Sequence, residues 1–549
     1  MKEISILIGG KAGEGIDTSG TLIGRILSHL GYKIYIYRDY PSLIRGGHTY
    51  SIIRACEKQI GSHYNSIDIL LALNQQTIDI HKDKLKNNTF ILYNSDAGKS
   101  EKGTGIPIDK IIKEENGIAV MGNTCIIGAL CKAIGINWDI AEKVLKKHIP
   151  KETELNLKIA KHGYDYVSQF INIDTGSNEP SALITGNEAI SLGLLKAGLT
   201  TYMAYPMTPS TGILHFLAQA GITDPTLKTL QPESEIGVIL MALGGIYAGE
   251  RIAIGTSGGG FCLMVEGLSF SSMAELPIVI ILGQRTAPST GLPTYTGQSD
   301  LLFAITCGHG GFFRFVVAPG DANQAYFWSA LSLSLAWKYQ IPSIIISDKT
   351  LAEGAYSFLP ELLNLQEKDI GLWEKEKSQF KRYLNTETGL SPLAFPGNKN
   401  AIIKINSYEH DEYGITTEDP YITKSMQEKR FKKNKLVFEE VEKHETLKIY
   451  GNKNSNEAIL TWGSNKDVCI EAGEILGMRV IQPIVMSPFP INRLNDALKG
   501  VSKIICVENN IDGQLASLVK YYGITVDRKI LKYDGRPFTA DELINKIKQ

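Results

Sequence analysis

Two acidic residues, Glu233 and Glu235, stand directly before IGVILMALGGIYAG, a run of apolar and small residues that predicts a helix. A carboxylate in the first turn of a helix is stabilised by the positive end of the helix dipole. Each acid could therefore cap this helix or act on a bound ligand. The sequence alone does not separate the two residues, which stand two positions apart.

The stretch TSGGGF begins at Thr256, Ser257 and Gly258 and contains no bulky side chain before its phenylalanine. Such a loop is suited to a place where a planar ring or a second chain comes close to the backbone. Small residues also recur in the preceding predicted helix, which lets another backbone pack closely.

The stretch YPMTPST begins at Tyr205 and Pro206 and follows the short apolar segment TYMA. Its two prolines restrict the backbone, while Thr208, Ser210 and Thr211 offer hydroxyl groups. This combination suits the binding of a small polar substrate, although an ordinary turn would have the same composition.

Arg285 follows the predicted buried strand PIVIILG, and the next residues, up to Thr294, form a loop. Ligands of open α/β sheets bind at the carboxyl ends of the strands, and arginine is a natural bidentate partner of a carboxylate. Arg285 therefore indicates an acidic substrate. The alternative is an arginine that braces the loop by pairing with a nearby acid.

The first part of the chain contains GGKAGEG, residues 9–15, between a predicted strand and a predicted helix. Backbone amides there could hold a phosphate or a carboxylate, but glycines serve equally in the tight turns of any doubly wound fold. Further along, PSLIRGGH places Arg45 and His48 in a predicted loop. Arg45 beside two glycines could approach an anion, whereas a lone histidine is more often structural.

Predicted strands alternate with predicted helices almost throughout the chain, which indicates an α/β fold of several doubly wound parallel sheets covered by helices. We expect a first domain over residues 1–175, a linker over 176–182 and a second domain over 183–352. Residues 353–445 read as an irregular extension with one charged helix. The strand and helix alternation then resumes in a last domain over residues 446–549.

The composition is that of an ordinary globular protein: 549 residues, 43% hydrophobic and 21% charged, with a formal charge of −1. A near-neutral balance gives no indication of nucleic-acid binding, and no apolar run approaches the ~20 residues of a membrane helix. The first residues predict a strand rather than a signal peptide, and hence a cytoplasmic protein. The seven cysteines form no C-x-x-C motif and are expected to be buried thiols in a reducing compartment.

Several of these motifs occur in one order that resembles the α subunit of 2-oxoacid:ferredoxin oxidoreductases: YPMTPST, then ESEI and TSGGGF, then QR with PSTGLPT and GQSDLLFA. Residues 1–175, with GGKAGEG and PSLIRGGH, resemble the γ domain of these enzymes, fused ahead of the α part. The segment SYEHDEYGITTEDP is similar to the 2-oxoglutarate type, and VENNIDGQL resembles a transketolase C-terminal-like domain. The resemblance implies that residues 183–352 are the pyrimidine-binding domain of a thiamine diphosphate enzyme.

The resemblance also implies the roles of the site residues. A carboxylate on the pyrimidine N1′ promotes the tautomer that activates thiamine, and Glu235 is our choice for it, with Glu233 second. Arg285, Thr208 and Thr294 are expected to bind the oxoacid. The remaining cofactor-binding residues are expected to be Tyr205, Pro206, Thr256, Ser257 and Gly258. The reaction would be oxidative decarboxylation of a 2-oxoacid, with coenzyme A as acyl acceptor and ferredoxin as electron acceptor.

The chain has no GDG motif to hold the diphosphate through Mg²⁺ and no cysteine cluster for a [4Fe–4S] centre. The resemblance implies that both lie on a β subunit, in an αβ or (αβ)₂ assembly. Two other interpretations remain open: a transketolase or decarboxylase subunit without ferredoxin chemistry, and a non-enzymatic regulator that binds a nucleotide through GGKAGEG.

Overall fold

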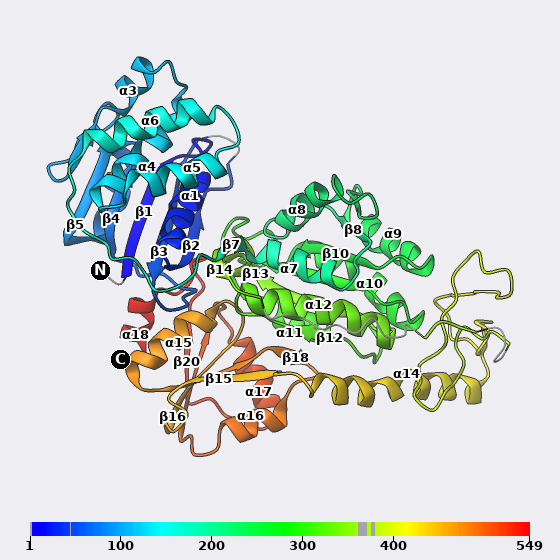
Figure 1. Cartoon of the computed structure of the whole chain (residues 1–549). Helices are drawn as coiled ribbons and strands as arrows, with labels where there is room; N and C mark the ends of the chain where they lie inside the picture. The colour runs from blue at the N-terminus through cyan, green and yellow to red at the C-terminus, as the bar shows by residue number, and fades with distance from the viewer. Residues whose placement is uncertain (1–2, 44–45, 361–370, 375–378) are drawn as a thin grey trace. The chain divides into compact units, whose positions relative to one another are not determined.

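The computed structural model describes residues 3–43, 46–360, 371–374 and 379–549, and its α/β architecture confirms the predicted fold class (Figure 1). The chain forms two compact units. The first comprises residues 1–185, 353–359 and 538–549, and the second comprises residues 186–352 and 360–537. The domain boundaries predicted from the sequence are finer than these units and stay predictions. Arg45 lies outside the described residues.

The first unit contains an eight-stranded sheet with the order β6-β5-β4-β1-β3-β2-β14-β7. The strands are β1 (Glu3–Lys11), β2 (Lys33–Asp39), β3 (His48–Cys56), β4 (Ile67–Ala72), β5 (Leu85–Asn94), β6 (Thr104–Ile106), β7 (Ala182–Thr185) and β14 (Ala355–Phe358). Strands β1, β4, β5 and β6 are parallel, but β3 is antiparallel to both of its neighbours. The sheet is therefore mixed, where the sequence predicted a parallel one. The short connection from β2 to β3 explains the difference, because a parallel pair needs a crossover of about a dozen residues or more.

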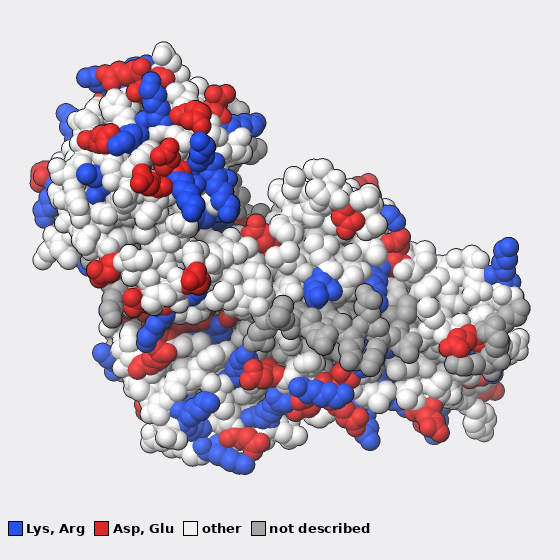
Figure 2. All heavy atoms as spheres, in the orientation of Figure 1, with Lys and Arg blue, Asp and Glu red and all other residues white. Residues whose placement is uncertain are grey.

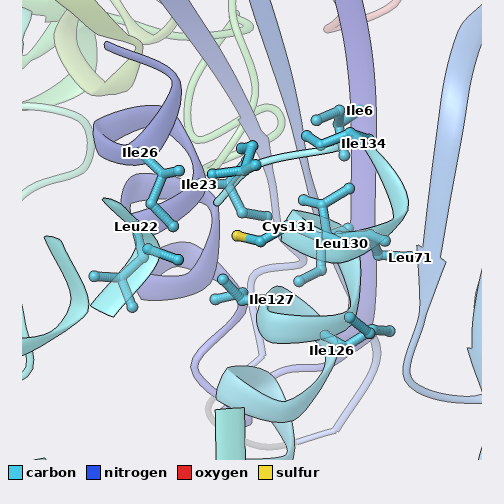
Figure 3. Packing of buried hydrophobic residues seen from close by; sticks show 14 of the residues in the cluster. Ile6, Leu22, Ile23, Ile26, Leu71, Ile126, Ile127, Leu130, Cys131 and Ile134 are labelled. Carbon is cyan, nitrogen blue, oxygen red and sulfur yellow. The ribbon is translucent and has the colours of Figure 1, made fainter. Parts of the chain in front are cut away.

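The helices of the first unit are α1 (Ile16–His29), α2 (Gln75–Ile80), α3 (Ile108–Glu114), α4 (Gly122–Ala133), α5 (Trp138–His148), α6 (Thr153–Tyr166) and α18 (Ala540–Lys548). One core joins α1 and α4 to the central strands (Figure 3). Ile6 of β1 and Leu71 of β4 belong to it, together with Ile127 and Leu130 of α4 and Ile23 of α1. This burial of aliphatic side chains is the main stabilising contribution of the unit.

The second unit contains a seven-stranded sheet with the order β18-β12-β13-β11-β10-β8-β9. Its strands are β8 (Thr201–Ala204), β9 (Lys228–Leu230), β10 (Ile252–Ser257), β11 (Val279–Gln284), β12 (Phe315–Val317), β13 (Ser343–Asp348) and β18 (Val485–Ser487). All adjacent pairs are parallel except β12 and β18. Around the sheet lie α7 (Gly186–Lys196), α8 (Thr211–Gly221), α9 (Glu235–Tyr247), α10 (Gly258–Met273), α11 (Leu301–Thr306), α12 (Ala322–Tyr339) and α13 (Lys349–Glu353).

A five-stranded sheet in the same unit has the order β15-β17-β16-β19-β20 and builds the part that we call the C-terminal block, residues 446–537. It consists of β15 (Leu447–Gly451), β16 (Glu457–Thr461), β17 (Arg479–Pro483), β19 (Lys503–Glu508) and β20 (Arg528–Leu531), with α15 (Asn465–Leu476), α16 (Ile491–Ala497) and α17 (Gln514–Tyr521). Strand β18 of this block joins the edge of the seven-stranded sheet. The two sheets of the unit are thus linked by backbone hydrogen bonds.

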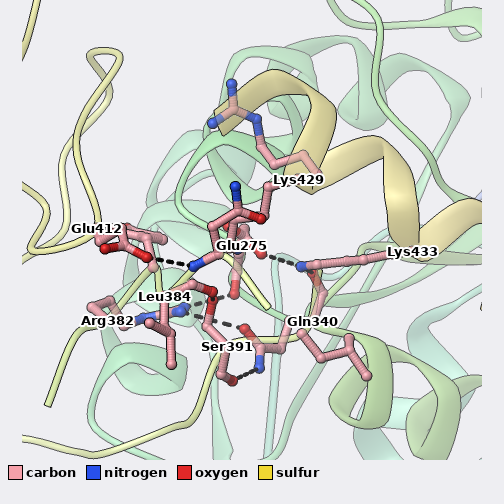
Figure 4. Close-up of polar contacts among 12 residues, drawn as sticks. Glu275, Gln340, Arg382, Leu384, Ser391, Glu412, Lys429 and Lys433 are labelled. Atoms are coloured by element: carbon pink, nitrogen blue, oxygen red, sulfur yellow. Dashed lines mark hydrogen bonds and ion pairs between the residues drawn. The ribbon is translucent and has the colours of Figure 1, made fainter. Parts of the chain in front are cut away.

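The charged helix predicted in the extension is α14 (Pro420–Val441). It begins at Asp419, whose side chain accepts hydrogen bonds from the amides of Tyr421 and Ile422, and at Pro420, a residue favoured in a first helical turn. Two of its lysines are buried against Glu275, which follows α10 (Figure 4): Lys429 Nζ lies 2.7 Å from one carboxylate oxygen, and Lys433 pairs with the other. This ion-pair cluster anchors α14.

No helix in the described ranges is long and apolar enough to cross a membrane. Acidic and basic side chains are interspersed on the described surface of the face drawn in Figure 2. The mixture of signs agrees with the near-zero formal charge of the sequence.

Candidate active site

The candidate site residues follow the carboxyl ends of four neighbouring parallel strands, β9, β8, β10 and β11. Tyr205 and Pro206 follow β8, Gly258 follows β10, and Arg285 follows β11. Glu235 begins α9, the helix after β9. The registers place Ala204 beside Gly255 and Gly283 beside Ser257, so the loops leave the sheet side by side. This is the edge at which open α/β sheets bind their ligands.

Glu235 and Glu233 have different surroundings. The Glu235 side chain is buried, and its Oε1 atom has no hydrogen-bond partner, whereas Glu233 is exposed. Ser234 is the N-cap of α9 and accepts a hydrogen bond from the amide of Gly237. Since Ser234 already caps the helix, Glu235 is not needed for that role. A buried carboxylate oxygen without a donor is costly, which indicates that a ligand supplies the donor.

The glycines after β10 make room around this carboxylate. A Cβ atom on Gly260 would lie 2.6 Å from Oε1 of Glu235, and one on Gly258 would lie 2.8 Å from Oδ1 of Asp300. A Cβ on Gly259, by contrast, would meet nothing within 4 Å. Ser257 is fully buried, and its hydroxyl oxygen also lacks a partner. The sequence predicted a loop here, but Thr256 and Ser257 end β10 and Gly258 begins α10. The junction of β10 and α10 therefore combines open space beside Gly259 with two buried polar atoms that lack a partner.

Arg285 is buried, and its Nη1 donates to the main-chain oxygen of Thr208 at 3.3 Å. No carboxylate among the described residues forms an ion pair with it. Burial lowers the pKa of Arg285, and the charge of Asp300 opposes this shift. The guanidinium has five N–H donors, so most of them stay available for a ligand. These contacts bring Arg285 and Thr208 together, and Asp300 is the nearby acid whose charge acts on the guanidinium.

The remaining predicted residues differ in exposure. Thr294 and Thr256 are buried, Pro206 is partly buried, and Tyr205 is exposed to 38%. The sequence interpretation assigned no role to Asp300, whose carboxylate is buried beside Gly258. Burial raises the pKa of Asp300 to about 6, although Arg285 acts in the opposite direction. The only sequence signal for Asp300 was its place in the GQSDLLFA motif.

The glycine-rich loop of the first unit has its own internal contacts. The carboxylate of Glu14 accepts a hydrogen bond from the amide of Lys11 at 2.8 Å. His48 lies with its Nε2 atom 2.8 Å from Nε2 of His81, and burial lowers the pKa of His48 and that of His81, the latter to about 3. His48, which the sequence predicted to lie in a loop, is the first residue of β3 and is packed against a second histidine.

Five of the seven cysteines are buried thiols. The expectation of buried thiols is wrong for Cys262, which is exposed on α10. No group of three or more His, Cys, Asp or Glu side chains in the described part of the chain could hold a metal ion.

A cavity of about 300 Å³ lies elsewhere in the second unit, between α10 and α14. Lys433, Arg430 and Phe431 of α14 contribute to its walls, and none of the candidate site residues does.

Comparisons with known proteins identify the family of the chain. Residues 192–428 match the family described as "Pyruvate flavodoxin/ferredoxin oxidoreductase, thiamine diP-bdg", and residues 5–166 match "Pyruvate ferredoxin/flavodoxin oxidoreductase". The 2-oxoacid:ferredoxin oxidoreductase subunit alpha of a Sulfolobus species is 34% identical over 98% of this chain and 96% of its own length. The corresponding subunit of Saccharolobus solfataricus is 33% identical over 99% and 97%.

A 2-oxoglutarate:ferredoxin oxidoreductase from Magnetococcus marinus, solved with 2-oxoglutarate, coenzyme A and succinyl-CoA bound, superimposes with a TM-score of 0.90. It is 29% identical and covers 100% of this chain and 99% of its own. The fold and the matched families thus define an α/β oxidoreductase subunit with a thiamine diphosphate-binding domain. The chain belongs to the 2-oxoacid:ferredoxin oxidoreductase α-subunit family.

Proposed function

We propose that this chain is the α subunit, with a γ domain fused at residues 1–175, of an enzyme that converts 2-oxoglutarate and coenzyme A to succinyl-CoA and CO₂ and passes electrons to ferredoxin. The resemblance of SYEHDEYGITTEDP to the 2-oxoglutarate type and the ligands named for the Magnetococcus marinus structure support this substrate. The observation within this chain that carries the proposal is the buried, unpartnered carboxylate oxygen of Glu235 beside the first turn of α10.

Thiamine diphosphate, when bound, supplies the carbon nucleophile that attacks the 2-oxo carbon. The residues of this chain fit its pyrimidine half. Glu235 would accept a hydrogen bond from the pyrimidine N1′ and so favour the reactive tautomer. The hydroxyl of Ser257 is another buried polar atom that lacks a partner, and Tyr205, Pro206, Thr256 and Gly258 complete the predicted cofactor-binding set.

Arg285, with Thr208 and Thr294, would hold the oxoacid. An arginine that is buried, unpaired with any described acid and held by one main-chain oxygen is suited to a bidentate contact with a substrate carboxylate. The guanidinium would orient the reacting carbonyl toward the cofactor, and this orientation contributes to the rate as well as to binding.

A β subunit would supply the diphosphate and Mg²⁺ site and the [4Fe–4S] cluster. We propose that it docks on α9 and α10 in an αβ or (αβ)₂ assembly. Ile236, Leu240 and Met241 of α9 and Leu263 of α10 are about half exposed, which is unusual for neighbouring large apolar residues. We also propose a cytoplasmic location. Six cysteines that form no disulfide support it: Cys125, Cys131, Cys262, Cys307, Cys469 and Cys506.

The test is to co-express this chain with its β subunit and to measure viologen reduction with pyruvate, 2-oxoglutarate and branched 2-oxoacids. We expect activity that depends on thiamine diphosphate and coenzyme A and is highest with 2-oxoglutarate. A preference for pyruvate would change the substrate assignment. Turnover of oxoacid without any electron transfer to viologen or ferredoxin would instead favour a decarboxylase or transketolase subunit.

A further inference from the structure

The segment from Thr294 to Asp300 is the last part of the connection from β11 to α11. It touches two parts of the candidate site. A Cβ atom on Gly297 would lie 3.0 Å from the main-chain oxygen of Arg285, so this part of the segment packs directly on the Arg285 backbone. At its end, the Asp300 carboxylate packs on Gly258. A shift of the segment would therefore displace the arginine or leave a gap beside it.

Between these two contacts, the side chain of Gln298 is completely buried in the C-terminal block. Its Nε2 donates to the main-chain oxygen of Trp462 at 3.0 Å. Its Oε1 accepts from the amide of Asn509 at 2.9 Å and from Nδ2 of Asn465 at 2.9 Å. Three buried hydrogen bonds hold the Gln298 side chain, and removing this side chain would leave each of the three partners unsatisfied.

The main chain of the segment is bound by the same block. The Gln298 amide donates to the oxygen of Asn509 at 2.8 Å, and Nδ2 of Asn510 donates to the Gln298 oxygen at 3.0 Å. Nε2 of Gln514 donates to the Ser299 oxygen at 2.8 Å. Residues more than 150 positions away in the sequence thus determine the path of the segment beside Arg285.

We propose that Gln298 is a positioning residue for the oxoacid, because its anchorage in the C-terminal block holds Gly297 against the backbone of Arg285. This inference rests on the proposed function of Arg285 as the partner of the substrate carboxylate. The C-terminal block then has a defined part in substrate binding, although it contributes no residue of its own to the candidate site.

The test uses the complete enzyme, co-purified with its β subunit. Gln298→Ala should raise KM for the oxoacid about tenfold, equivalent to ~1.4 kcal/mol, with KM for coenzyme A unchanged and kcat within about threefold. Asn465→Ala removes only one of the three side-chain bonds and should shift the same KM by about two- to threefold. Gln219→Ala, at an exposed position of α8, is the matched control and should change neither constant.

A double-mutant cycle shows whether Gln298 acts through Arg285. In an Arg285→Met background, Gln298→Ala should change kcat/KM by less than about twofold, because the arginine that it positions is gone. An undiminished effect in that background would overturn the inference. Equal changes in the KM for the oxoacid and the KM for coenzyme A would also overturn it, as would the failure of both Gln298→Ala and Asn465→Ala to fold. A normal kcat/KM for Arg285→Met alone would instead overturn the proposed role of Arg285.

Discussion

At the scale of single residues, the exposed fraction separates the two acids at the start of α9. Glu235 is buried to 6% exposure, with one oxygen that has no donor, and Glu233 is exposed. Residues two positions apart at a helix start point in different directions, so one can face the sheet edge while the other faces solvent. The role of Glu235 stays a prediction that mutation can test.

Glu235→Gln should leave the fold and the partner subunit in place but remove most of the coenzyme A-dependent oxoacid oxidation. An amide keeps the shape of the side chain, yet it cannot promote the pyrimidine tautomer as a carboxylate does. The measurement is viologen reduction by the co-purified complex, with circular dichroism as the fold control. Glu233→Gln is the matched variant and should retain near-normal turnover; the reverse pattern would assign the role to Glu233.

Arg285→Met should leave thermal stability nearly unchanged while kcat/KM for the oxoacid falls by roughly two to three orders of magnitude. A charge-assisted hydrogen-bond pair contributes ~1.5–3 kcal/mol, and misorientation of the carbonyl adds to the loss. Arg285→Lys should recover only part of this, since an ammonium lacks the planar fork. A Met variant that melts several degrees lower yet turns over oxoacid normally would show that the arginine is a brace.

Asp300 should make the stability of the chain depend on pH. Its pKa of about 6 in the folded state lies above the usual value of an aspartate, so the folded state holds the proton more tightly and the free energy of unfolding falls as pH rises through this window. Asp300→Asn removes the effect. The free energy of unfolding of this variant minus that of the wild type should increase by about 1–2 kcal/mol from pH 5 to pH 7.5. Urea unfolding of both proteins at several pH values is the measurement, and a difference that does not change with pH would contradict the shift.

At the scale of elements, α14 depends on one buried carboxylate. Glu275, Lys429 and Lys433 are each at most 2% exposed. Burial alone would raise the pKa of Glu275, but Lys429, Lys433 and Arg382 outweigh it and hold this pKa well below its usual range. Burial lowers the pKa of Lys433 to about 7, against the attraction of Glu275. The negative charge of Glu275 therefore offsets part of the free-energy cost of burying two lysines.

Glu275→Gln should destabilise the second unit by about 3–5 kcal/mol, because two buried lysines lose their counter-charge and must either stay charged or give up a proton. The measurement is the free energy of unfolding from denaturant titration. The control is Glu439→Gln on the same helix, whose exposed partner Lys435 lies 3.8 Å away and should contribute no more than about 0.5 kcal/mol. Equal effects of the two substitutions would mean that the Glu275 cluster does not anchor α14.

At the scale of the whole molecule, large apolar side chains of α9 and α10 are about half exposed near the candidate site. Under the proposed function, the carboxyl edge of β8, β10 and β11 would bind the pyrimidine ring and the oxoacid. We expect the proposed β subunit to complete this site in the assembled enzyme.

The chain purified alone should contain no iron and bind thiamine diphosphate only weakly, while the complex with the β subunit should bind both. Metal analysis and calorimetry with thiamine diphosphate are the measurements. Stoichiometric iron in the single chain would contradict the expected division of the site.

Replacing Leu240 with Glu should weaken the complex without changing the fold of the single chain, since it places a charge on the apolar face of α9.

The sequence by itself determined the fold class, the family and the loops that carry the candidate site. Each rests on local patterns: the alternation of strands and helices, the glycines after β10, and the order of motifs along the chain. These can be read without coordinates because periodicity and turn residues act over a few positions.

Only the tertiary structure decided which of two neighbouring acids is buried, that the first sheet is mixed, and which partners surround Gln298, Asp300 and Glu275. The side-chain partners of Gln298 are 164 to 211 positions away in the sequence, and the lysines of Glu275 are 154 and 158 positions away. No local pattern specifies such pairs, because they depend on how whole elements pack against one another. The burial that shifts the pKa of Asp300 has the same origin, since it exists only once the segment after β11 lies on Gly258.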